Sequence, residues 1–299
     1  AEDGILDSVA ARGRGDVYKR QGYTCGLAGK LHLASCSDGR VEERTDDGYD
    51  IFHWSHHPQP DWPENAYTQW LSAKGKTWDE LYDGPETPYV KHGIPAEYHQ
   101  TTWAAEMCCD FIRLQAGAEP WFYSLNCFAP HNPIEAPAGY LSRYKPADMP
   151  LPNYREGELE NKPLYQKLDH EWAHNEPGYF HVAGMSEDDQ RQVCAAYYAM
   201  IELIDDQVGR ILAALQESGQ ADNTLVIFMS DHGEMLGDHG IYLKGPHFYE
   251  AVVHVPVVMR WPGRIRPGQQ ADTFIELVDL CPTLLEAAGL EIPERVQGN

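Results

Sequence analysis

Apolar residues in this chain gather into short runs that are separated by longer polar stretches rich in glycine and proline. The run at residues 225–229 has strand length and contains β-branched and aromatic side chains, so it predicts a buried strand. Runs at 23–28 and 121–129 predict two more strands, and a further apolar run at 252–261 returns after the first. We interpret these runs as strands of an open α/β sheet.

Two longer segments carry apolar residues at helical spacing. In the segment 101–117, Thr101 or Thr102 is the expected N-cap. The segment 186–219 has the strongest helical pattern, and Ser186 with an acidic residue three positions later forms a partial capping box. We therefore predict helices over both segments.

The segments between these elements predict irregular structure. Residues 46–100 are rich in aromatic, histidine and proline residues, and 134–185 reads as a long excursion across the surface. His53, His56 and His57 suggest a metal site, but their spacing lacks the supporting ligands of a zinc pattern. A substrate-facing loop and a plain irregular loop both stay open for this histidine-rich stretch.

Candidate chemistry follows the predicted strand at 225–229. Ser230-Asp231-His232-Gly233 stands where that strand ends, and ligands of open α/β sheets bind outside the carboxyl ends of strands. A carboxylate and an imidazole there can bind a divalent cation. Lys244 follows on a glycine-rich loop and can reach back over the same point. The alternative is a simple turn, which is the usual role of Asp-His-Gly after a strand.

Three more polar residues follow the other predicted strands. Lys30 and His32 come after the strand at 23–28, and alternate residues of an extended chain face one side, so both can face one pocket. His131 lies between Pro130 and Pro133, which stiffen the backbone after the strand at 121–129. Taken singly, each of these residues is equally compatible with a solvated loop.

Composition narrows the function classes. The 299 residues include 46 Asp and Glu against 23 Lys and Arg, and a net charge of −23 argues against nucleic-acid and anionic-membrane partners. No apolar run reaches the length of a membrane span. Seven cysteines without a repeating spacing predict neither a disulfide framework nor a zinc site. The hydrophobic content of 42% is sufficient for one large domain.

The motifs together resemble the sulfatases of the alkaline-phosphatase superfamily. S-D-H-G, G-D-H-G, K, Y-E and V-P occur in order within 224–263. GYTCGLAGKLHL near the start, FAPHNP in the middle and DLCPTLLEAAG near the end match further family elements. The resemblance implies an alkaline-phosphatase-like α/β fold with a mostly parallel central sheet, helices on both faces, and incomplete ends.

The resemblance also divides the chain. Residues 1–21 match no family element and are expected to be a disordered or artefactual leader, whereas 22–299 resembles a partial sulfatase catalytic domain without the C-terminal subdomain. The family's formylglycine is made from Cys or Ser in C/S-x-P/A-x-R, upstream of the G-K-x-H element, and this sequence lacks it there. Residues 36–40 imitate that outline, but they lie downstream of His32 and have Asp38 in place of Pro or Ala.

The resemblance implies a metal cofactor. Asp231 and His232 correspond to metal ligands, and an upstream Asp-Asp pair that completes the family's shell is not in this sequence. Calcium is the expected ion, and the His ligand makes manganese possible. Formylglycine is expected only in the full-length protein.

The resemblance implies substrate roles for four residues. Lys30 and Lys244 would hold sulfate oxygens, with Lys244 also near the leaving oxygen, and His131 would hydrogen-bond sulfate or protonate the leaving group. His32 would act as a base during turnover.

The expected function is metal-dependent hydrolysis of a sulfate ester, of a small molecule or a sulfated carbohydrate, with this chain alone inactive. One alternative is a phosphonate or phosphodiester hydrolase of the same superfamily, and another is a non-catalytic remnant that binds a metal or an anion. The family makes a periplasmic or secreted location plausible, and the sequence leaves the oligomeric state open.

Overall fold

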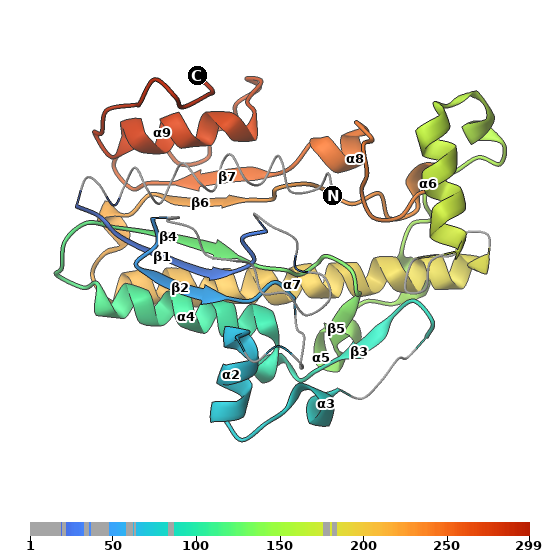
Figure 1. Cartoon of the computed structure of the whole chain (residues 1–299), viewed down its shortest axis with the longest axis horizontal. Coiled ribbons are helices and arrows are strands. Elements are labelled where there is room, and N and C mark those ends of the chain that lie inside the picture. The colour runs from blue at the N-terminus through green and yellow to red at the C-terminus, as the bar shows by residue number, and fades with distance from the viewer. Residues whose placement is uncertain are drawn as a thin grey trace.

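The computed structural model describes residues 19, 22–32, 36, 48–57, 62, 64–82, 87–175, 180 and 184–299 (Figure 1). The strands of this part form three sheets. One is parallel in the order β2–β1–β4, one is the parallel pair β3–β5, and one is the antiparallel pair β6–β7. Their bounds are β1 (Thr24–Gly29), β2 (Ile51–Trp54), β3 (Lys91–Gly93), β4 (Trp121–Asn126), β5 (Glu135–Pro137), β6 (Val226–Met229) and β7 (Val257–Arg260).

Helices cover both faces of this sheet system (Figure 1). The α-helices are α2 (Ala66–Ala73), α3 (Trp78–Leu81), α4 (Gln100–Leu114), α5 (Ala138–Leu141), α6 (Leu164–Asn175), α7 (Glu187–Glu217), α8 (Glu250–Val253) and α9 (Leu280–Ala287). Short 3-10 helices are η1 (Ala96–Tyr98), η2 (Pro146–Asp148), η3 (Glu158–Asn161), η5 (Ala221–Asn223), η6 (Asp238–Gly240) and η7 (Leu277–Asp279). Among the described helices, none is long and apolar enough to cross a membrane.

The side chains of the central strand β1 are buried on both of its faces, between two layers of helices. Cys25 and Leu27 are fully buried in the cluster that contains Leu285 of α9. Ala28 points to the opposite face and packs in the cluster that contains Trp103 of α4. Because successive side chains alternate between faces, a strand with small and apolar residues at every position can be covered on both sides. The α/β architecture with helices on both faces is confirmed.

The helix predictions are confirmed with one correction at a cap. The long helix begins after Ser186, whose hydroxyl accepts the Asp189 N–H while the Asp189 side chain accepts the Ser186 N–H, so the capping box is complete. The helix predicted at 101–117 begins at Gln100, and its N-cap is His99 rather than a threonine. The His99 ring accepts the Thr101 N–H at 3.1 Å, which gives an imidazole the role that usually belongs to a short polar side chain.

The two segments predicted as irregular contain regular elements. The stretch 46–100 includes β2, α2, α3 and β3, and His53 lies in strand β2 rather than in a loop. The stretch 134–185 includes β5 and α6 and is therefore more than a surface excursion. The proline-rich sequence did not predict these elements, because short strands and helices are stabilised by tertiary contacts more than by their own propensity.

Some expectations lie outside the described residues. These are the proposed leader at 1–21, except Lys19, and the formylglycine-like outline at 36–40, except Cys36. All seven cysteines are free thiols, five of them buried and two, Cys127 and Cys194, partly exposed.

Gly29 sets the spacing between β1 and β4 at the level where the site begins. Its φ is +110°, and a Cβ at this position would lie 1.9 Å from the carbonyl oxygen of Asn126. No side chain fits there without separating the two strands. The next residue, Lys30, therefore depends on this close approach for its position.

We expect Gly29→Ala to destabilise the fold by roughly 2–5 kcal/mol, because the substitution combines backbone strain with overpacking. Urea denaturation followed by circular dichroism measures this. The control is Gly209→Ala, because Gly209 lies within α7 with open space around its missing Cβ. That change should stabilise by up to about 1 kcal/mol. Equal stabilities of the two variants would contradict the packing argument.

Candidate functional site

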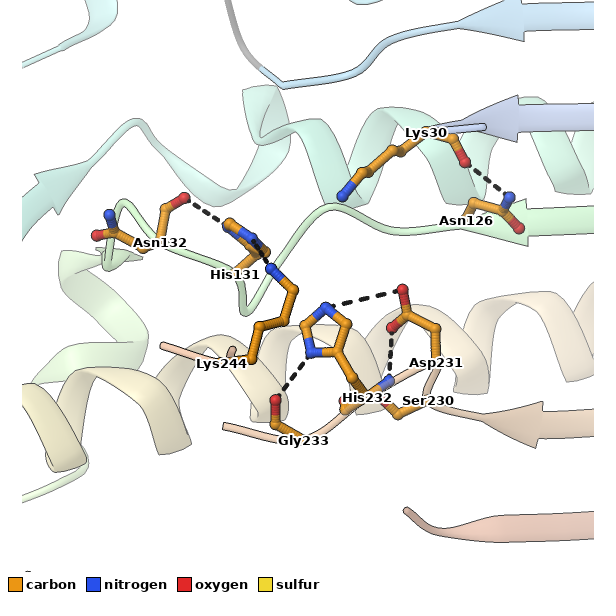
Figure 2. Close-up of polar contacts among 9 residues, drawn as sticks. All are labelled: Lys30, Asn126, His131, Asn132, Ser230, Asp231, His232, Gly233 and Lys244. Carbon is orange, nitrogen blue, oxygen red and sulfur yellow. Dashed lines mark hydrogen bonds and ion pairs between the residues drawn. The ribbon is translucent and has the colours of Figure 1, made fainter. Parts of the chain in front are cut away.

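The candidate residues lie where strands end. Lys30 follows β1, His131 follows β4 and Asp231-His232 follow β6, while Lys244 lies on the loop after β6. Figure 2 shows the side chains of Lys30, His131, Lys244 and His232 pointing into one region between the ends of these strands. The structure thus brings together residues as far apart in the sequence as Lys30 and Lys244.

Asp231 and His232 place a carboxylate oxygen and an imidazole nitrogen near each other. The His232 Nδ1–H donates to the carbonyl of Gly233 at 2.8 Å, so Nε2 carries the lone pair. That Nε2 lies 3.8 Å from Oδ2 of Asp231. Ligands about 2.1–2.5 Å from one cation lie roughly 3–3.5 Å apart, and an imidazole whose other nitrogen donates to a carbonyl is the usual metal-bound arrangement.

The pair fits a divalent cation in its chemistry, and its 3.8 Å spacing is slightly wider than that of two ligands on one ion, but it does not complete a site. Across the described residues, no group of three or more His, Cys, Asp or Glu side chains could hold a metal ion. The side chain of Asp231 is 48% exposed, so it is accessible to an ion and to further ligands.

His131 is held as a neutral acceptor. Its Nδ1–H donates to the carbonyl of Asn132 at 2.8 Å, and its Nε2 lies 3.3 Å from Nζ of Lys244, which donates to it. Burial and, after it, the nearby charges of Lys244 and Lys30 lower the pKa of His131 to about 4. The imidazole therefore stays uncharged near neutral pH and aligns the ammonium of Lys244.

Lys30 is fixed at its backbone by the neighbouring strand. Its N–H donates to the carbonyl of Asn126 at 3.1 Å, and the Asn126 side-chain amide donates back to the Lys30 carbonyl at 2.7 Å (Figure 2). The ammonium lies 5.8 Å from the ring centre of Phe128, within reach of a cation–π contact. Lys30 is thus aimed along the strand ends toward His131.

His32 departs from the predicted geometry. Its φ is 53°, so the backbone at this residue is left-handed and the alternation expected for an extended chain does not apply. Its ring contacts the ring of His56, edge to face, with centroids 4.6 Å apart. His32 therefore lies on the side of the site formed by the segment after β2.

The loop that carries Lys244 is held by residues of the stretch 134–185. Nδ1 of His239 lies 2.9 Å from a carboxylate oxygen of Glu158, and the buried His247 lies 2.8 Å from that of Asp169. The first contact ties the loop to η3 and the second ties it to α6. Lys244 is positioned between these two attachments.

Two buried carboxyl groups were not predicted from the sequence. Burial raises the pKa of Glu234, which directly follows the Asp-His-Gly motif, to about 7, and its carboxylate accepts the Leu236 N–H at 3.2 Å. Burial also raises the pKa of Glu135 to about 7, and Glu135 and His131 line the same small cavity, of about 20 Å³. An acidic residue between the apolar Ile134 and Ala136 was the available signal.

Comparisons with known proteins identify the family of this chain. The family model described as Sulfatase matches residues 15–290. The chain belongs to the sulfatase family. It is 34% identical over 283 residues to an arylsulfatase of Clostridium perfringens, covering 90% of this chain and 52% of that protein. Arylsulfatases and other sulfatases among the relatives make it a sulfatase by family.

Two further similar proteins carry names other than sulfatase. The multifunctional alkaline phosphatase superfamily protein PehA of Trinickia caryophylli is 35% identical over 244 residues, covering 79% of this chain and 46% of that protein. The solved phosphonate monoester hydrolase of Agrobacterium radiobacter superposes with a TM-score of 0.72 at 26% identity, covering 95% of this sulfatase-family chain and 60% of that structure. The chain spans about half the length of the curated relatives it matches.

We expect Lys244→Met to raise the pKa of His131, because the substitution removes the positive charge that opposes its protonation. Titration of the His131 ring by NMR measures this. The control is Lys76→Met, since Lys76 pairs with Glu80 on an exposed surface. An unchanged midpoint in Lys244→Met would contradict the assigned contact.

The same depressed pKa predicts acid sensitivity. The unfolded chain protonates His131 near pH 6.5, whereas the folded chain does so near pH 4. The contribution of this residue to stability is therefore lost as the pH falls through that window. Denaturation midpoints of the wild type and of His131→Gln, measured between pH 7 and pH 4, should converge as the pH falls.

Proposed function

We propose that the full protein is a metal-dependent sulfuric ester hydrolase and that its substrate is a sulfated carbohydrate. The observation that carries this proposal is the convergence of two ammonium groups, the imidazole of His131 and the Asp231–His232 pair at the ends of β1, β4 and β6 (Figure 2). A sulfate ester is a tetrahedral anion, and a cluster of this kind stabilises the negative charge that develops during its cleavage.

The proposed roles follow from the contacts. Lys30 and Lys244 hold sulfate oxygens, and Lys244 is directed by its 3.3 Å contact with Nε2 of His131. A bound sulfate places negative charge beside these groups, which counters the effect of the lysines and favours the protonated form of His131. His131 then donates a proton to the leaving oxygen. His32, in contact with His56, is the proposed base.

The proposed cation is held by Asp231 and His232, with calcium preferred for the carboxylate and manganese possible because of the imidazole. When bound, such an ion supplies Lewis-acid stabilisation of an ester oxygen. The rest of its shell and a formylglycine nucleophile, both general features of sulfatases, are proposed to belong to a segment outside residues 22–299. On this proposal, the present chain alone does not turn over substrate.

A second candidate is hydrolysis of phosphonate monoesters or phosphodiesters. The observation that favours it is the likeness to the phosphonate monoester hydrolase of Agrobacterium radiobacter at 26% identity over 95% of this chain. Sulfate and phosphonate esters share tetrahedral shape and negative charge, and the described contacts suit both. We rank it second because the arylsulfatase relative is more similar and covers a comparable share of this chain.

The test compares this chain with a longer protein that includes the preceding segment, using p-nitrophenyl sulfate and p-nitrophenyl phenylphosphonate. We expect turnover only in the longer protein, with a higher kcat/KM for the sulfate. Lys244→Ala should lower kcat about 10²–10³-fold, the loss typical of one charge-stabilising group. Lys76→Ala, in an exposed ion pair, is the matched control.

Three outcomes contradict the proposal at different points. Faster cleavage of the phosphonate favours the second candidate. Turnover by this chain alone that Lys244→Ala abolishes refutes the idea that the chain lacks its nucleophile. A longer protein without activity on either ester supports a non-catalytic relative that binds a metal or an anion.

A further inference from the structure

The short segment after β2 lies at the same edge of the sheet as the proposed catalytic groups. Strand β2 runs parallel to β1, with Gly29 opposite Trp54 at their carboxyl ends. His56 and His57 therefore follow β2 at the level at which Lys30 follows β1. The proposed chemistry uses neither of these two histidines.

This segment is held rigidly by groups on three elements. Ser55 is fully buried, its N–H donates to the carbonyl of Gly29 at 3.1 Å, and its hydroxyl accepts the Gln100 side-chain amide at 2.6 Å. The side-chain amide of the buried Asn65, the N-cap of α2, donates to the carbonyl of His57 at 3.0 Å. Anchoring on both sides fixes the intervening imidazoles before any ligand arrives, which is how a binding site is preorganised.

The two imidazoles form one wall with Phe128. The ring of His57 lies 5.7 Å and that of His56 6.2 Å from the ring of Phe128, measured between centroids. The ring of Phe128 also lies 4.9 Å from the ring of His131, between centroids. The wall thus connects directly to the group proposed to protonate the leaving oxygen.

Burial favours the uncharged form of both imidazoles. Burial and, after it, the charge of Lys30 lower the pKa of His56 to about 2. Burial and then Lys30 also lower the pKa of His57. A neutral imidazole offers one hydrogen-bond donor and one acceptor. These rings are therefore poor partners for the sulfate anion and good partners for a group that both donates and accepts.

The position of the wall indicates which part of an ester it meets. Asp231 and His232 occupy the β6 side of the site, and Lys244 approaches from its loop. The β2 side remains for the alcohol portion of the ester. Among the described residues, the buried Nδ1 of His56 has no hydrogen-bond partner, which is consistent with a polar group placed there by a ligand.

We propose that His57, together with His56 and Phe128, forms the subsite for a hydroxyl-bearing alcohol portion of the ester, such as a sugar ring. This inference rests on the proposed sulfate-ester function and adds its specificity-determining residues. Sugar hydroxyl groups both donate and accept, as neutral imidazoles do, and the face of Phe128 packs against the apolar face of the ring.

The test measures binding by isothermal titration calorimetry, with the full chain and with calcium present. Three probes separate the parts of the site: inorganic sulfate, p-nitrophenyl sulfate and glucose 6-sulfate. The main variant is His57→Phe, which keeps an aromatic ring beside Phe128 and Trp62 but removes the hydrogen bonds. We expect this variant to bind glucose 6-sulfate about fivefold more weakly, which is the loss of affinity expected for one hydrogen bond. Its affinity for the other two probes should be unchanged.

Two further variants keep the result interpretable. His57→Gln retains a donor and an acceptor, so its affinity for glucose 6-sulfate should lie between those of the wild type and His57→Phe. His254→Phe makes the same exchange at an exposed position of the chain, where the side chain is 81% exposed, and should change no affinity. Circular dichroism verifies that each variant is folded.

The outcomes distinguish the two proposals. If the wild type binds none of the three probes, the sulfate site and the subsite that rests on it are both rejected. If His57→Phe weakens inorganic sulfate as much as glucose 6-sulfate, or weakens neither, the subsite is overturned and the sulfatase proposal stands. Selective loss of glucose 6-sulfate binding supports the subsite.

Discussion

The close pairing of β1 with β4 is the constraint on which the rest of the site depends. Gly29 pairs with Asn126 at the ends of the two strands, and its missing side chain permits a contact that no other residue allows. The pairing continues past the strand end, since the Asn126 amide donates to the carbonyl of Lys30. Lys30 and the segment that carries His131 are therefore fixed to each other before any ligand binds.

The candidate site is positively charged, whereas the chain as a whole is strongly negative. The protein carries a net charge of −23, yet Lys30, Lys244 and several imidazoles gather at one edge of the sheet. Burial and mutual repulsion keep His131 and His56 neutral, so only the ammonium groups remain as cations near neutral pH. This arrangement concentrates positive charge at Lys30 and Lys244 and leaves neutral polar groups on the β2 side.

The part of the molecule that supports Lys244 is distant in the sequence. Residues 153–169 attach to the loop at 238–249 through a hydrogen bond from the His239 N–H to the Asn153 carbonyl and through two imidazole–carboxylate contacts. Within the loop, His239 stacks on Tyr249, with ring centroids 4.1 Å apart. A loop with this many partners holds its lysine in one position, which lowers the entropic cost of binding an anion.

The sequence by itself determined the architecture and the site candidates whose signals are local. The apolar run of β6, the helical spacing of α7 with its capping box, and the polar residues that follow each strand are all visible within short windows. The order of motifs was sufficient to indicate the family, which the family model confirmed over residues 15–290. Placing site residues at strand ends was predictable because parallel strands end at one edge.

Tertiary structure decided what depends on contacts between distant residues. The left-handed backbone of His32 turned its side chain toward His56, against the alternation expected for extended chain. The histidine cap of α4 likewise has no local signature. Burial and hydrogen-bond partners are properties of the packed chain, so the protonation of His131 and the support of Lys244 could be established only after the elements were packed together.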